Sequence, residues 1–491
     1  MQLTQRISSG HCIKSGQFKM IPVCIEQTTG SATASHFVSS QQPERLIIFA
    51  RFPRSGQVKT RLIPALGADH AARLHQALTH RALQVARDYA LQRCCDVEVY
   101  FTGGEIEEMS RLFGVDLRYC IQNGDNLGQR LDAAARTAFA DGAERVIIIG
   151  TDCPDLEPKL IQEANDSLQN ADLVLGPARD GGYYLVGMRA HRRELFEGIA
   201  WGTETVLHQT LEIASRLNWK VHRLCPLSDI DNPEDLISCR RLAAALPGGL
   251  FEERRGVISI VIPTLNEEAQ LDGALRHIAN IPDIEVIVAD GGSKDATIQI
   301  AKQYGARVVP VRAGRARQMN AGAAVASGET LLFLHADTRL PSDFRKQVCA
   351  ALDSGSSAGA FRLRIDDDGF GFRCIEWGAN LRSKFLQLPY GDQGLFVRAS
   401  LFYQLGGFTE LALMEDFEMC RRLRRHGDLF QASSAVTTSP RRWLDLGIVR
   451  TTVVNQLCVA GYLLGIPSER LARWYSARAG YSPSRLRMPP D

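Results

Sequence analysis

One pattern occurs twice along this chain, and it constrains the fold more than any other feature. An apolar run ends in a turn, a stretch with helical periodicity follows, and another apolar run begins. The first series starts at residues 46–50 and the second at residues 257–262. Strands that alternate with helices build a largely parallel sheet with helices packed against it. We therefore predict two α/β domains of the same kind in tandem.

The length of the chain and a linker-like stretch between its halves agree with this division. The 491 residues exceed what one hydrophobic core usually holds. The stretch PGGLFEERRG at 247–256 combines Pro, Gly and charge without periodicity, which is typical of a linker. The predicted segments are a leader at 1–43, a first domain at 44–245, a linker at 246–256, a second domain at 257–480 and a tail at 481–491.

Composition excludes several classes of protein. The net charge of +2 provides no field that would recruit nucleic acid. The twelve cysteines show no C-x-x-C spacing, which favours reduced thiols in a cytoplasmic, bacterial enzyme. No apolar run reaches the roughly 18 residues of a membrane span; the closest, 453–466, leaves open a peripheral contact with the inner membrane. The leader lacks the layout of a signal peptide, so we expect it to be disordered or to reflect a start codon assigned too early.

Aspartates stand at the ends of predicted strands in both halves. Asp152 follows RVIIIGT, whereas Asp290 and Asp337 follow IEVIVA and TLLFLHA. In open α/β sheets ligands bind beyond the carboxyl ends of the strands, and clustered carboxylates repel unless a cation neutralises them. Mg²⁺ or Mn²⁺ is held by one or two carboxylates plus substrate phosphates, so the pattern indicates a nucleotide-diphosphate substrate. Each aspartate taken singly also fits a turn residue or a helix cap.

The dinucleotide-binding and P-loop motifs are absent from the sequence. No G-x-G-x-x-G follows a strand, and FPRSGQVKT has neither the spacing nor the second glycine of a P-loop. The strand-end carboxylates are therefore the candidates for the chemistry.

Six segments of the second half stand in a characteristic order. They are SIVIPTLNEE, VIVADGGSKD, NAGAAVASGETLLFLHADT, GDQGLFVRASLFYQLGGF, LMEDFEMCRRLRRHG and SPRRW. In order and spacing they resemble family-2 glycosyltransferases of the GT-A fold, over roughly residues 257–475, and are most similar to a bacterial arsenosugar-biosynthesis subgroup. The resemblance implies inverting transfer of a sugar from a nucleotide-diphosphate sugar to a hydroxyl or carboxyl acceptor. That acceptor could be a small metabolite, a lipid or a carotenoid acid, and the cofactor Mg²⁺ or Mn²⁺.

The resemblance implies a set of donor-binding residues in the second half. They are Pro263, Thr264, Asn266, Glu267, Asp290, Arg317, Asp392, Gln393, Arg442 and Trp443, with Arg442 on the diphosphate and Trp443 stacked on a sugar. Thr264 and Glu267 fit a capping box as well. Arg315 and Arg317 fit a solvated basic face as well as a diphosphate contact.

Metal and base positions also follow from the resemblance. The Asp-x-Asp of the family reads His335 and Asp337 here, so the metal is assigned to Asp337, with His335 as a nucleotide or outer contact. Histidine can ligate Mn²⁺ but is a poor partner for Mg²⁺. Asp416 is implied as the general base that deprotonates the acceptor, and Glu415 is the next candidate. Both acids would also compensate a helix dipole.

The first half contains GQVKTRLIPALG, GTDCPDL, GPARDGGYYLVG, WGTETVL and DIDNPEDL. These segments resemble a partner subgroup related to nucleotidyltransferase-like GT-A domains. Asp152 and Asp231 are the candidate metal pair, and Gly56, Lys59 and Arg61 would cradle phosphates, although Lys59 and Arg61 fit a solvated turn too. Three functions stay open for this half: a second sugar transferase, a nucleotidyltransferase that makes the activated sugar, or a binding module without catalysis.

Overall fold

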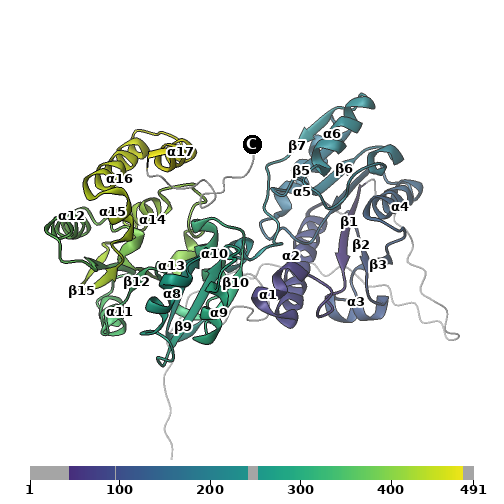
Figure 1. Ribbon diagram of the computed structural model, residues 1–491. Coiled ribbons are helices and arrows are strands. Elements are labelled where there is room, and N and C mark those ends of the chain that lie inside the picture. The colour runs from purple at the N-terminus through teal and green to yellow at the C-terminus, as the bar shows by residue number, and fades with distance from the viewer. Residues whose placement is uncertain (1–43, 94, 242–252, 479–491) are drawn as a thin grey trace, which may run out of the picture. The chain divides into compact units, whose positions relative to one another are not determined.

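The computed structural model describes residues 44–93, 95–241 and 253–478 (Figure 1). The predicted leader, the tail and most of the predicted linker lie outside these residues. The last part of the predicted linker belongs to a strand that begins at Arg254. None of the described helices combines the length and the apolar character that crossing a bilayer requires.

Seven strands form the first sheet, in the order β3-β2-β1-β4-β6-β5-β7. Their bounds are β1 Glu44–Arg51, β2 Asp96–Thr102, β3 Arg118–Ile121, β4 Arg145–Ile149, β5 Leu173–Pro177, β6 Tyr183–Met188 and β7 Val221–Arg223. β1 pairs in parallel with β2 and β4, whereas β6 runs antiparallel to both β4 and β5. The carboxyl ends of β1, β2 and β4 therefore meet at one edge of the sheet.

Helices cover both faces of the first sheet. The helices of the first half are η1 Thr60–Leu62, α1 Ile63–Leu66, α2 Ala68–Arg93, α3 Ile106–Phe113, α4 Leu127–Ala140, α5 Pro158–Ser167, η2 Arg193–Phe196, α6 Val206–Arg216, η3 Pro233–Asp235 and α7 Leu236–Arg241. Neighbouring residues of a strand point to opposite faces. Leu46 and Ile48 accordingly pack with α2, α3 and α5, whereas Ile47 packs with α4 and α6. Asn232 caps the start of η3, in a capping box with Asp235.

Eight strands form the second sheet, in the order β10-β9-β8-β11-β14-β13-β15-β12. Their bounds are β8 Arg254–Thr264, β9 Ile284–Asp290, β10 Arg307–Pro310, β11 Gly328–Phe333, β12 Thr338–Arg339, β13 Ala358–Ile365, β14 Leu395–Arg398 and β15 Phe430–Thr438. β8 pairs in parallel with β9 and β11, and β14 runs antiparallel to β11 and β13.

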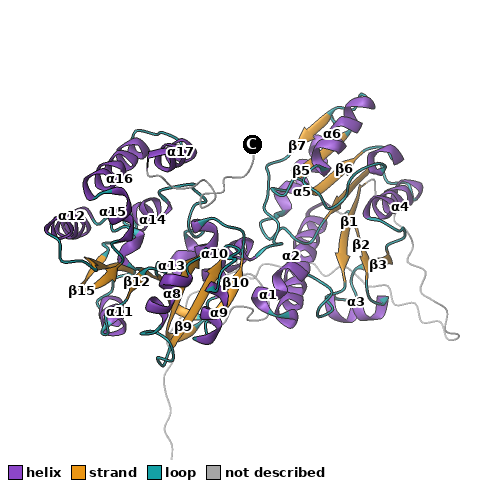
Figure 2. Ribbon diagram, viewed as in Figure 1, coloured by secondary structure: helices purple, strands orange, loops and turns teal. Residues whose placement is uncertain are grey.

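The second sheet is covered in the same manner (Figure 2). Its helices are α8 Glu268–Leu275, α9 Thr297–Gln303, α10 Arg315–Val325, α11 Phe344–Asp353, α12 Phe370–Leu386, η5 Gly391–Gln393, α13 Ala399–Gln404, α14 Glu415–Leu423, α15 Arg441–Leu446, α16 Ile448–Leu463 and α17 Ser468–Arg478. Ile260 and Ile262 pack with α8, α9 and α11, whereas Val261 packs with α10, α13 and α14.

The two sheets share one topology. Seven strands of the second sheet repeat the order of the first, with β8 in the place of β1 and antiparallel β14 in the place of β6. The fold class predicted from the repeated pattern, two α/β domains of the same kind, is confirmed.

One local prediction is wrong. Thr264 does not cap a helix, because it ends β8 and its hydroxyl donates to Asp290 Oδ1 at 3.2 Å. Gly328 is the first residue of β11, where a Cβ would lie 2.6 Å from the Val257 carbonyl oxygen. In both cases close approach of neighbouring strands decides the role of the residue.

Candidate active sites

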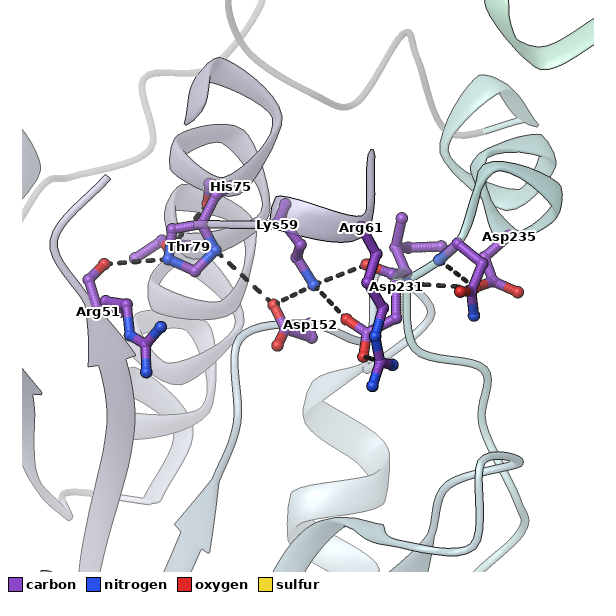
Figure 3. Close-up of polar contacts among 10 residues, drawn as sticks. Arg51, Lys59, Arg61, His75, Thr79, Asp152, Asp231 and Asp235 are labelled. Carbon is purple, nitrogen blue, oxygen red and sulfur yellow. Dashed lines mark hydrogen bonds and ion pairs between the residues drawn. The ribbon is translucent and has the colours of Figure 1, made fainter. Parts of the chain in front are cut away.

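An ammonium group lies between two carboxylates at the carboxyl edge of the first sheet (Figure 3). Lys59 Nζ is 2.8 Å from Asp152 Oδ1 and 3.1 Å from Asp231 Oδ1, and it donates to the Ile230 carbonyl oxygen at 2.6 Å. The Lys59 side chain is 4% exposed. A lysine ammonium has three donors, so this buried cation is fully paired.

The positive charge of Lys59 and the negative charges of Asp152 and Asp231 stabilise one another. Burial alone would lower the pKa of Lys59, but the carboxylates of Asp152 and Asp231 outweigh it and raise that pKa above its usual range. The two predicted metal ligands are thus brought together, with a lysine as their counter-ion. The roles differ from the prediction, because the lysine assigned to phosphate neutralises the pair assigned to metal. Within the described part of the chain, no three His, Cys, Asp or Glu side chains gather as a metal site.

The turn that carries Lys59 explains its position. Gly56 has a φ of 78° and Lys59 a φ of 47°, both in the left-handed region that glycine tolerates best. This turn leads into η1 and directs the lysine inward, whereas Arg61 is 67% exposed, with Nη1 3.5 Å from Asp231 Oδ2. The solvated-turn interpretation therefore fits Arg61 and fails for Lys59.

His75 is a member of this centre that the sequence analysis missed. Its Nδ1 lies 3.8 Å from Asp152 Oδ1, and its Nε2 contacts the Arg51 carbonyl oxygen at 3.0 Å. Burial lowers the pKa of His75, which favours the neutral ring. His75 sits within the long helix α2, and only its contact with a strand end distinguishes it from an ordinary helix residue.

A cavity of about 740 Å³ opens beside the Lys59 centre. Its lining includes Arg51, Gln122, Arg130, Asp180, Trp201 and Asp229. Burial, together with the charges of Asp180 and Asp231, raises the pKa of Asp229 to about 7. The cavity therefore joins a guanidinium-rich side to carboxylates, which suits a ligand that carries phosphates and a cation.

In the second domain, Glu415 and Asp416 begin α14 and face Arg315 of α10. Arg315 Nη1 is 3.4 Å from Glu415 Oε1 and 4.0 Å from Asp416 Oδ2. The side chains of Glu415 and Asp416 are only 5% and 16% exposed. Burial, followed by the charge of Glu415, raises the pKa of Asp416 to about 7, and Arg315 opposes this rise.

Asp337 and His335 border the same centre. Burial would lower the pKa of Arg315, but Glu415, Asp416 and Asp337 hold it above its usual range, which places Asp337 within electrostatic reach. A Cβ added to Gly391 would lie 2.1 Å from Asp416 Oδ2 and 2.8 Å from His335 Nε2. Asp416 Oδ2 and His335 Nε2 therefore lie close to each other, beside Gly391. The predicted metal and base residues converge around one glycine.

Hydrogen bonds join the two loops that follow β8 and β9, where several of the predicted nucleotide-binding residues lie. Asp290 accepts from the backbone N–H groups of Gly292 and Ser293, both at 2.9 Å, and from the Thr264 hydroxyl. Asn266 Oδ1 accepts from the Lys294 N–H at 2.8 Å. Other residues of the pair follow: Pro263 lies in β8, and the Glu267 N–H donates to the Thr297 hydroxyl. The carboxylate of Asp290 thus fixes the loop that follows β9.

Three predicted contacts point elsewhere. Gln393 is fully buried, and its Oε1 accepts from Ser383 while its Nε2 donates to the Phe361 carbonyl oxygen, so the amide holds the core together. Trp443 is 9% exposed and packs edge-on against Phe372, which leaves no face for a sugar. Arg317 binds Glu410 at 2.8 Å, because two residues along a helix turn it away from Arg315.

Two further predictions have partial outcomes. Asp392 lies close enough to add to the raised pKa of Asp416. The side chain of Arg442 lies outside the described side chains, whereas neighbouring Arg441 places Nη2 3.6 Å from Glu267 Oε2.

Two family models match the chain. Residues 259–403 match "Glycosyl transferase family 2", and residues 85–203 match DUF2064, a family described as an uncharacterized protein conserved in bacteria. The second half thus contains a glycosyl transferase family 2 domain. The arsenosugar subgroup predicted for both halves finds no support in these matches.

Curated relatives cover parts of the chain. The PGL/p-HBAD biosynthesis glycosyltransferase of Mycobacterium tuberculosis is 32% identical over 165 residues, which is 31% of this chain and 63% of the relative. Glucosyl-3-phosphoglycerate synthase of the same organism is 37% identical over 92 residues, 16% of this chain and 28% of the relative. The chain therefore spans less than two thirds of the length of either relative.

Solved structures superpose weakly on the whole chain. One, described provisionally as a nucleotide-diphospho-sugar transferase from Desulfovibrio desulfuricans, is 33% identical, covering 40% of this chain and 87% of its own, with a TM-score of 0.38. Mycobacterial glucosyl-3-phosphoglycerate synthase with Mn²⁺ and UDP is 21% identical, covering 43% and 81%, with a TM-score of 0.31. Scores this low carry no conclusion about function.

Proposed function

We propose that the second domain, whose residues 259–403 match glycosyl transferase family 2, transfers a sugar with inversion and uses Asp416 as general base. The observation that carries the proposal is the position of the Asp416 carboxylate. It is largely buried at the start of α14, has a raised pKa, and lies near both Arg315 and His335. Raised pKa values near neutrality suit a group that must take up a proton during turnover.

The reaction follows from this geometry. Asp416 Oδ2 accepts the proton of the acceptor hydroxyl while the acceptor oxygen forms a bond to the anomeric carbon of the donor. The bond from that carbon to the diphosphate breaks, and the nucleoside diphosphate leaves with the electron pair. Attack from the side opposite the leaving group inverts the configuration. The Arg315 guanidinium holds Glu415 and Asp416 in place before the proton moves. An acceptor carboxylate would need no such deprotonation.

The donor set around Asp337 fits a divalent cation carried by a nucleotide. Mg²⁺ and Mn²⁺ bind through one or two carboxylates plus phosphates. The Asp337 carboxylate, with His335 nearby, is therefore a sufficient protein ligand set for a cation that the donor's diphosphate also binds. When bound, the cation would supply positive charge that stabilises the departing diphosphate.

Replacing Asp337 with alanine should abolish the Mn²⁺-dependent part of UDP-sugar or GDP-sugar binding. The carboxylate borders the site at a strand end and is not part of the core, so the fold should persist. Isothermal titration of the full chain with and without Mn²⁺ measures the effect. Asp353→Ala, an exposed carboxylate of α11, is the matched control. Unchanged metal-dependent affinity in Asp337→Ala would remove the metal from this residue.

The rate of transfer should depend on pH through Asp416. The carboxylate must be ionised to accept a proton, so kcat/KM should rise with pH and level off above about 7. An aspartate with the ordinary pKa of about 3.9 would leave the profile flat through this range. Initial rates across buffers of equal ionic strength test this, and a flat profile would contradict the assignment.

For the first domain we propose nucleotidyl transfer, in which a sugar phosphate attacks the α-phosphorus of a nucleoside triphosphate and diphosphate leaves. The supporting observation is the cavity of about 740 Å³ beside Lys59, Asp152 and Asp231. Arg51 and Arg130 on its wall suit phosphates, and Trp201 offers an aromatic surface for a base. This activity would make the activated sugar that the second domain consumes.

Lys59→Gln should weaken binding of a nucleoside triphosphate by about 10- to 100-fold. The loss of charged hydrogen bonds, about 1.5–3 kcal/mol each, would leave Asp152 and Asp231 without their counter-ion beside the phosphates. The assay uses Asp337→Ala as the background, so that the second domain contributes little. Lys220→Ala, an exposed lysine outside the cavity, is the control. If the triphosphate binds but no sugar phosphate causes release of diphosphate, the first domain is a binding module without catalysis. Undiminished binding of the triphosphate in Lys59→Gln would exclude this cavity as the binding site.

A further inference from the structure

Helix α12 presents an apolar side to solvent. Phe370, Trp377, Leu381 and Phe385 are 85%, 69%, 40% and 68% exposed, and Cys374 between them is exposed too. Spacings of three, four and seven residues place these side chains on one side of a helix. We call them the α12 stripe.

Helix α16 presents a second apolar side. Val449, Val453, Leu457 and Leu464 are all exposed and recur at four and seven residues, and together they are called the α16 stripe. Arg450 is the one charged residue in the sequence of this helix. The opposite side of α16 is buried in the domain through Thr451, Val454, Cys458 and Gly461.

Both stripes belong to the same end of the second domain. Phe372 and Ile375 of α12, Trp443 of α15 and Ile448 of α16 form one small core. Figure 1 shows α12, α15 and α16 gathered at this end of the domain. Most of the exposed large apolar side chains in the described part of the chain fall between residues 370 and 466. Exposed apolar surface concentrated in this way indicates an interaction site.

Positive charge accompanies the α16 stripe. Residues 441–478 contain six arginines and two acidic residues, a net charge of +4, whereas the whole chain carries only +2. Lys384 stands beside the α12 stripe, with Nζ 5.7 Å from the centre of the Phe385 ring. Aromatic and aliphatic residues on one side of a helix with basic residues around them are typical of helices that lie in a membrane interface.

We propose that this end of the second domain docks on an anionic lipid bilayer, with the stripes of α12 and α16 inserted at the level of the head groups. The basic residues around the stripes complement the charge of such a surface. A symmetric contact with a second copy would place two positively charged surfaces against each other, which disfavours that occupant. The proposal concerns the surface alone and holds whichever reaction the domain performs.

Sedimentation of the full-length protein with vesicles tests this proposal. One set of vesicles is phosphatidylcholine alone, and the other is phosphatidylcholine and phosphatidylglycerol in equal parts. The protein should sediment with the anionic vesicles and less with the neutral ones. The double variant Phe385→Glu, Leu457→Glu should lose binding by about tenfold or more, since two apolar anchors become charged.

A matched control separates this surface from apolar exposure in general. Leu91 and Val115 of the first domain are 83% and 84% exposed, so Leu91→Glu, Val115→Glu should bind vesicles as the wild type does. The proposal is overturned if the wild type ignores anionic vesicles or if the double variant binds equally well. It is also overturned if the wild type is a dimer that Phe385→Glu, Leu457→Glu converts to a monomer, because a second copy would then cover the stripes.

Discussion

Replacing Asp416 with asparagine is expected to lower sugar transfer by about 10²- to 10⁴-fold, which is the usual contribution of a general base. Asparagine keeps the size and polarity of the side chain but cannot take up the acceptor proton. Donor binding should be nearly unchanged, because the proton is transferred only during the chemical step. Release of nucleoside diphosphate measures turnover, and slow hydrolysis of the donor serves where no acceptor is known.

Stability distinguishes this role from a structural one. Folding raises the pKa of Asp416 to about 7, so the folded state loses stability relative to the unfolded chain as the pH rises from about 4 to about 7. Asparagine removes this cost, so the Tm above neutral pH should hold or rise. A carboxylate that served only the helix dipole would contribute about 0.3–1 kcal/mol to stability, and its loss would lower the Tm without touching turnover. In that event Glu415→Gln becomes the next variant to assay.

Gly391→Ala is expected to lower transfer by about 10²-fold, because a shift of roughly 1 Å in a reacting group has that effect. The new Cβ would lie 2.1 Å from Asp416 Oδ2 and 2.8 Å from His335 Nε2, so the carboxylate and the ring must both move. The substitution adds one methyl group and removes no functional group. A loss of activity would therefore report the position of Asp416 rather than its presence.

Gly273→Ala in α8 is the matched control for this prediction. A Cβ at Gly273 meets nothing within 4 Å, and alanine is the better helix former by roughly 0.5–1 kcal/mol. Its activity should stay at the wild-type level with an equal or higher Tm. Wild-type turnover in Gly391→Ala would mean that the site tolerates displacement of Asp416, and the base would have to be sought elsewhere.

Local chemistry in the sequence was sufficient for the fold class and indicated several residues of the candidate sites. Strand periodicity with a repeat of the same order determined two α/β domains, because the burial of both sheet faces requires apolar runs that helices then cover. Strand-end position alone brought Asp152 and Asp337 to the correct edges of their sheets. Motif order indicated the family-2 domain, and the pair Glu415 and Asp416 lies at a helix start as predicted.

Tertiary structure decided what each polar side chain faces. Gln393 and Trp443 stand in motifs that suggested ligand contacts, yet the core surrounds both, because burial depends on neighbours far along the chain. The sequence did not distinguish Arg315 from Arg317. In the folded helix α10 only Arg315 faces Glu415 and Asp416, whereas Arg317 binds Glu410. Lys59 fitted a solvated turn until two residues from distant segments, Asp152 and Asp231, were found to enclose it. A pattern of residue types records which chemistry is available, whereas the distance between two groups remote in sequence exists only once the sheets have formed.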